Sequence, residues 1–110
     1  MKLSVVIPVF NEEKTIEKVL ERVLGQAIGD WEKEIIVIND GSSDATGEKL
    51  EKFSGRVRII HHPRNQGKGQ ALQTGFEMAE GDAVIVQDAD LEYDPSDWPS
   101  LLKELQENPD

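Results

Sequence analysis

The chain of 110 residues contains no cysteine. Disulfide bonds, zinc–thiolate centres and thiol nucleophiles are therefore excluded. Long hydrophobic runs are also missing, because no segment approaches the roughly 18 consecutive apolar residues of a transmembrane helix. The short apolar run after Met1 and Lys2 is broken by Pro8 and is unlike the apolar region of a signal peptide. We therefore expect the chain as given to be cytoplasmic.

Basic residues are scarce. Lysine and arginine total 12 against 22 aspartate and glutamate residues, which gives a formal net charge of -10. Nucleic-acid-binding domains normally present a basic face, so we expect no nucleic-acid partner. An anionic small molecule would also be repelled unless a metal ion or local basic groups such as Arg64 and Lys68 offset the charge.

Short apolar runs alternate with amphipathic segments along the whole chain. Strands are predicted over 3–9, 34–39, 57–61 and 83–87, and helices after residue 11, over 45–54, from about 69 to 80 and after residue 94. Runs that are apolar on both faces are typical of central strands in a parallel sheet. The pattern predicts a single α/β domain, a three-layer sandwich around a mainly parallel sheet.

Three local predictions follow from propensity and periodicity. Asn11 is a good N-cap for the first helix, because two glutamates follow it. The helix that begins near residue 69 is predicted to bury Leu72 and Phe76 together with two alanines, Ala71 and Ala79. The run 83–86 is predicted to be a buried strand.

Polar segments follow three of the strands, over 8–12, 39–44 and 87–90. Because the carboxyl ends of parallel strands share one edge, we expect these segments to form one rim, where ligands bind in such sheets. Asp88 and Asp90 supply hard oxygen ligands that suit Mg²⁺ or Mn²⁺ together with phosphate oxygens. Burying both charges without a cation would be costly, so this tip is predicted to hold a metal–diphosphate. The alternative is a solvated acidic turn.

Other residues on this rim have two interpretations each. Asp40 ends a strand, where an acid can accept hydrogen bonds from a base or ribose, but it can equally be structural. Phe10 can stack on a base, while Glu12 either reaches a base edge or only complements a helix dipole. Lys68 either offsets phosphate charge or is solvated. Asp44 is predicted to cap the following helix.

Four stretches of the chain together resemble the family 2 glycosyltransferases, which have the Rossmann-like GT-A fold. These stretches are Val5–Glu13, Val37–Thr46, Asn65–Leu72 and Asp88–Pro95, and they occur in the order typical of the family. The last stretch is most similar to the dolichol-phosphate mannosyltransferase and polyprenyl-phosphate glucosyltransferase branch. The resemblance implies that residues 1–110 are the N-terminal, donor-binding part of a longer catalytic domain.

The resemblance also implies roles for individual residues. Asp88 and Asp90 would be the catalytic residues that bind metal and diphosphate. Glu92 would be a further metal ligand, at a position where this branch often has an amide. The nucleotide would be held by Pro8, Phe10, Glu12, Ile38, Asp40, Lys68, Asp88 and Ala89.

The reaction that the resemblance implies is an inverting, Mg²⁺- or Mn²⁺-dependent hexose transfer from a GDP- or UDP-sugar, such as GDP-mannose or UDP-glucose. The implied acceptor is a polyprenyl phosphate, so the full-length protein would associate with a membrane. The alternatives are a nucleotide-sugar-binding module without activity, a sugar-nucleotide pyrophosphorylase and a haloacid-dehalogenase-type phosphatase. The last two lack sequence signals that they normally show.

We expect the isolated chain to bind nucleotide weakly and to turn over slowly or not at all. A homodimer is one open alternative for the oligomeric state.

Overall fold

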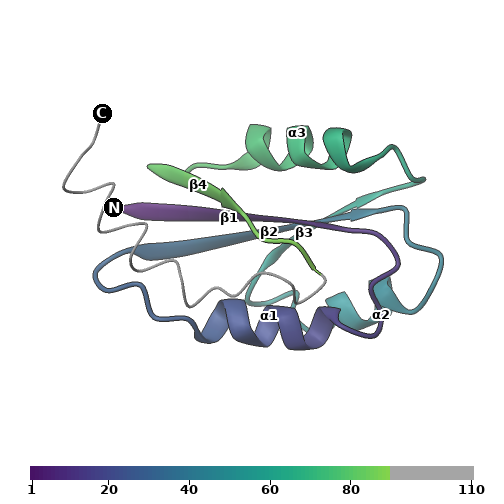
Figure 1. Cartoon of the computed structure of the whole chain (residues 1–110), viewed down its shortest axis with the longest axis horizontal. Helices are drawn as coiled ribbons and strands as arrows, with labels where there is room; N and C mark the ends of the chain where they lie inside the picture. Colours follow the sequence, from purple (N-terminus) through teal and green to yellow (C-terminus); the bar gives the residue numbers. More distant parts are fainter. Residues whose placement is uncertain (90–110) are drawn as a thin grey trace.

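The structure, a computed structural model, describes residues 1–89. Its parallel sheet has four strands in the order β3-β2-β1-β4. Helices α1 and α2 cover one face of this sheet and α3 covers the other (Figure 1). The elements in chain order are β1 (Lys2–Val9), α1 (Ile16–Gly25), β2 (Glu32–Asp40), α2 (Thr46–Glu51), β3 (Arg58–His62), α3 (Lys68–Met78) and β4 (Ala83–Val86). The predicted three-layer α/β fold is confirmed, while the helix predicted after residue 94 lies outside the described residues.

The two central strands are apolar on both faces, as the sequence predicted. Leu3, Val5 and Ile7 of β1 belong to the core on the α1 side, which also holds Leu20 and Val23 of α1. On the other face, Ile36 and Ile38 of β2 pack with Ala71 of α3. Burial on both faces fixes the register, because a one-residue slip would exchange the two sets of side chains.

Helix α3 approaches the sheet closely at a glycine. A Cβ atom on Gly75 would lie 2.3 Å from Cγ1 of Val6. Ala71 and Gly75, four residues apart, are the buried residues of α3. Because these two small residues face the sheet, Phe76 points away and is 49% exposed, and Leu72 is only half-buried. The prediction that Phe76 is buried was therefore wrong.

Strand β4 is an edge strand within the described part of the chain. Its burial alternates: Val84 and Val86 are exposed, whereas Ala83 and Ile85 pack against the core on the α1 side. Helix α3 lies over β1 and β2 rather than over β4. The prediction of a buried fourth strand therefore holds only for the face with Ala83 and Ile85, because the face with Val84 and Val86 is exposed in the described residues 1–89.

A buried carboxylate, Glu34, links several strands at the end of the sheet opposite the predicted rim. Glu34 accepts hydrogen bonds from the hydroxyl of Ser4 at 2.7 Å and from the backbone N–H of Glu80 at 3.0 Å, and it pairs with Arg58 at 3.2 Å. Burial by itself would raise the pKa of Glu34, but these partners outweigh it and hold the pKa below its ordinary value. Glu34 therefore connects β1, β2, β3 and the turn before β4.

No helix in residues 1–89 combines the length and the apolar character needed to cross a membrane.

Candidate functional site

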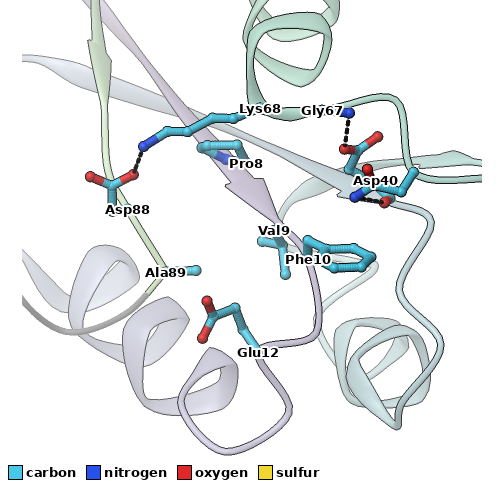
Figure 2. A pocket seen from close by; sticks show the side chains of 10 residues that line it. Pro8, Val9, Phe10, Glu12, Asp40, Gly67, Lys68, Asp88 and Ala89 are labelled. Atoms are coloured by element: carbon cyan, nitrogen blue, oxygen red, sulfur yellow. Dashed lines mark hydrogen bonds and ion pairs between the residues drawn. The ribbon is translucent and has the colours of Figure 1, made fainter.

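A pocket of ≈ 490 Å³ opens at the carboxyl edge of the sheet, where parallel sheets bind their ligands (Figure 2). Its lining residues come from the ends of β1, β2 and β4 and from the loop before α3. They are Pro8, Val9, Phe10, Glu12, Asp40, Asn65, Gly67, Lys68, Asp88 and Ala89. The structure therefore brings together all of the predicted nucleotide-binding residues except one. Ile38 is fully buried in the core beneath α3, so its side chain offers no surface to a ligand.

Hydrogen bonds join the loop after β1 to the loop after β2. The backbone N–H of Asn11 donates to Ser42 Oγ at 2.9 Å, and the Asn11 side-chain oxygen accepts from the N–H of Ser43 at 2.8 Å. Asn11 has a left-handed backbone with a φ of 51°, and α1 begins only at Ile16 with Thr15 as its N-cap. The prediction that Asn11 caps α1 was therefore wrong, because its side chain serves this contact between loops.

Two further residues complete the junction of these loops. Asp44 accepts the backbone N–H of Thr46, the first residue of α2, at 2.9 Å. It thus supports the start of α2, although Ala45 occupies the N-cap position itself. Thr46 Oγ1 in turn accepts the backbone N–H of Glu12 at 2.9 Å. These contacts fix the backbone that carries Phe10 and Glu12.

Phe10 and Glu12 form one side of the pocket. The Phe10 side chain is 46% exposed, which leaves an aromatic face available for stacking. The Glu12 carboxylate points into the pocket toward Ala89 (Figure 2). Thr15 Oγ1 lies 2.6 Å from the carbonyl oxygen of Ala89 and 3.2 Å from Glu12 Oε2. Thr15 therefore connects the end of β4 to the start of α1 on this side.

Asp40, the last residue of β2, also lines the pocket and is 2% exposed. Its Oδ1 lies 2.9 Å from His62 Nδ1 and accepts the N–H of Gln66 at 3.0 Å, and its Oδ2 accepts the N–H of Gly67 at 2.9 Å. Burial alone would raise the pKa of Asp40, but the bonds from His62, Gln66 and Gly67 lower it below its ordinary value. Asp40 is therefore an ionised anchor for the loop before α3.

The chain folds tightly around this anchor because of a glycine. Gly41 has a φ of 72°, and a Cβ atom there would lie 2.3 Å from the backbone of Arg64 and Asn65. Only glycine allows this approach without a rearrangement. In the sequence Gly41 is only one residue of a polar segment, and Asn65, Val9 and the Asp40–His62 contact have no local signal that could reveal them.

Asp88 and Lys68 form an ion pair across the mouth of the pocket, with Nζ 2.7 Å from Oδ1 (Figure 2). Asp88 is the hard oxygen donor that the sequence predicted at the end of β4, and its chemistry fits Mg²⁺ or Mn²⁺. Within residues 1–89 no cluster of three or more potential metal-ligating side chains occurs. The other two predicted ligands, Asp90 and Glu92, lie outside the described residues.

A parallel sheet with a pocket at its carboxyl edge defines the chain as an α/β ligand-binding domain of the doubly wound type. The family model for Glycosyl transferase family 2 matches residues 4–110, and the chain belongs to this family.

Curated relatives agree with this assignment. A dodecaprenyl-phosphate galacturonate synthase from Rhizobium johnstonii is 38% identical over 113 residues, which cover 96% of this chain and 33% of the relative. A dolichol-phosphate mannosyltransferase from Pyrococcus furiosus is 35% identical over 112 residues, which cover 100% of this chain and 32% of the relative. The chain thus spans about a third of the length of these relatives.

Solved structures show the same architecture. The structure of residues 1–349 of S. aureus TarS in complex with UDP-GlcNAc superposes with a TM-score of 0.84 at 27% identity, over 97% of this chain and 32% of that TarS fragment. The mannosyltransferase PcManGT from Pyrobaculum calidifontis, in complex with GDP-Man and Mn2+, gives a TM-score of 0.81 at 25% identity, over 94% of this chain and 32% of that protein. The predicted family and its GT-A fold are confirmed.

Proposed function

We propose that residues 1–110 form the donor-binding part of a longer glycosyltransferase. The complete enzyme would transfer a hexose, with inversion, from a GDP- or UDP-sugar to a polyprenyl phosphate. The observation that carries this proposal is the pocket between Phe10, Asp40 and Asp88 at the carboxyl edge of the sheet. Support for the ligands comes from relatives named for polyprenyl-phosphate substrates and from related structures that hold UDP-GlcNAc or GDP-Man with Mn2+.

The pocket holds an exposed aromatic ring and, away from it, a lysine, which suit the base and the diphosphate of a nucleotide. The exposed Phe10 ring can stack on the base. The Lys68 ammonium offsets diphosphate charge. Asp88, with Asp90 and Glu92, would hold the divalent cation, which as a Lewis acid stabilises the leaving diphosphate. A phosphate acceptor is already anionic and needs little help from a general base.

Calorimetric titration of GDP and UDP into the chain, with and without Mn²⁺, tests the donor site. We expect one nucleotide to bind in a Mn²⁺-dependent manner, with little or no sugar transfer by the chain alone. Asp88→Asn and Asp90→Asn should each weaken binding at least tenfold, because a neutral amide is a poorer ligand for a hard cation.

Asp82→Asn is the matched control, because Asp82 lies before β4 and accepts the backbone N–H of Lys2 at the opposite edge of the sheet. It should leave nucleotide binding unchanged. Metal-independent binding that survives Asp88→Asn and Asp90→Asn would contradict the assigned cation site. Failure of the unmodified chain to bind either nucleotide would contradict the proposed function.

A further inference from the structure

The Asp40 carboxylate is largely satisfied from within the protein. His62 Nδ1, the Gln66 N–H and the Gly67 N–H all lie within 3.0 Å of its oxygens. A carboxylate has about four lone-pair positions, so these partners occupy most of its capacity. The main role of the Asp40 carboxylate is therefore to hold the loop before α3, and little of its hydrogen-bonding capacity is left for a ligand.

His62 joins that carboxylate to helix α3. Its Nδ1 faces Asp40 at 2.9 Å, and its Nε2 lies 3.1 Å from Thr74 Oγ1, on the second turn of α3. Because an ionised carboxylate only accepts hydrogen bonds, Nδ1 must carry a proton. The His62 side chain is 10% exposed and is not part of the pocket lining.

The segment that His62 and Asp40 hold has little packing of its own. Gln66 and Lys68 are exposed, and Gly67 has a φ of 99°. Its backbone is fixed by the two N–H bonds to Asp40 and by the start of α3, where the Gly67 carbonyl accepts the N–H of Ala71 at 3.1 Å. Lys68 comes next in the chain and reaches Asp88, so the direction of Lys68 depends on this anchored backbone.

We propose that His62 is a positioning residue, which holds Asp40 and thereby the Gln66–Lys68 backbone in the shape that receives the nucleotide diphosphate. Nucleotide affinity then depends on a side chain outside the pocket. This inference rests on the proposed function, because it concerns the affinity of the same pocket.

The adjacent histidine provides a matched control. His61 Nε2 lies 3.1 Å from Glu51 on the α2 side of the sheet, and the His61 side chain is 44% exposed. His61→Ala therefore removes the same kind of side chain from the same strand without touching Asp40. His62→Asn is the conservative variant, because its amide N–H can take the place of the Nδ1–H and donate to Asp40.

The experiment measures two quantities on the unmodified chain and on the variants His62→Ala, His62→Asn and His61→Ala. The first is the dissociation constant of the nucleotide that binds, titrated with Mn²⁺. The second is amide hydrogen exchange at Gln66 and Gly67, followed by NMR, with the amides of β1 as an internal measure of folding. In His62→Ala we expect about tenfold weaker binding or more, since a hydrogen bond to a charged group is lost, and faster exchange at both amides. His62→Asn should restore most of both, and His61→Ala should change neither.

The outcomes separate this inference from the proposed function. Unchanged affinity and exchange in His62→Ala would overturn the inference alone. The inference would also be overturned if His62→Asn lost as much affinity as His62→Ala and the β1 amides exchanged rapidly in both variants. His62 would then be needed only for folding. If the unmodified chain binds neither nucleotide, the proposed function fails and the claim about affinity fails with it.

Discussion

The close contact between Gly75 and Val6 predicts an unusual effect for a glycine-to-alanine substitution. In an exposed helix, Gly→Ala stabilises by about 1 kcal/mol, because alanine has the better helix propensity. In Gly75→Ala the new methyl group would lie 2.3 Å from Cγ1 and 3.3 Å from Cβ of Val6. Val6 cannot turn away easily, since it is β-branched and fully buried on a central strand between β2 and β4.

The expected magnitude is the difference between these two effects. Inserting a methyl group into a well-packed core costs about 1–3 kcal/mol, so Gly75→Ala should lower the free energy of unfolding by about 0–2 kcal/mol. Gly69→Ala is the matched control in the first turn of α3, where a Cβ would meet nothing within 4 Å. It should be neutral or stabilising by up to about 1 kcal/mol. Gly75→Ala should therefore be less stable than Gly69→Ala, by up to about 3 kcal/mol.

Urea unfolding at constant m value measures both variants. The double variant Val6→Ala/Gly75→Ala should recover at least about 1 kcal/mol relative to the sum of the single changes, because each relieves the effect of the other. Because α3 begins at Lys68, Gly75→Ala should also weaken nucleotide binding by displacing the helix. If Gly75→Ala stabilised the chain as much as Gly69→Ala, the close approach of α3 to β1 would be refuted.

Two more predictions concern charge. Lys68→Met should tighten Mn²⁺ binding without nucleotide by up to about fivefold, since it removes a competing cation from Asp88, and should weaken nucleotide binding in saturating Mn²⁺. Calorimetric titrations of Mn²⁺ alone, and of nucleotide in saturating Mn²⁺, measure the two affinities, with Lys52→Met as the control. If Lys68→Met strengthened both affinities or weakened both, the prediction would be contradicted. Glu34→Gln should lower the free energy of unfolding at pH 7 by about 1–3 kcal/mol, because its charged hydrogen bonds are lost. Since the folded pKa of Glu34 lies below its ordinary value of 4.5, this difference should be complete above about pH 4.5 and shrink as the pH falls through the folded pKa. Urea unfolding at a series of pH values checks it, and a difference that grows in acid would refute the assignment.

The sequence by itself determined the order of strands and helices and the rim on which the polar segments gather. Each apolar run is visible in the local sequence. In β1 and β2 the run is apolar on both faces, which is consistent only with a central strand that is covered on both sides. Parallel pairing then places the strand ends, and with them Phe10 and Asp88, on one edge. The motifs also predicted the family, because several of them occur together in one order.

Only the tertiary structure decided how individual side chains are used. Phe76 is exposed because Ala71 and Gly75 face the sheet, and no periodicity reveals which stripe of a weakly amphipathic helix packs. Asn11 bonds to the loop after β2 instead of capping α1. Its partner there, Ser43, lies 32 residues away, so the local sequence around Asn11 does not show this contact. Asp40 and His62 are 22 residues apart in the chain and meet only because β2 and β3 pair. Contacts between residues so distant in sequence leave no local signal, so they follow from the fold and not from propensity.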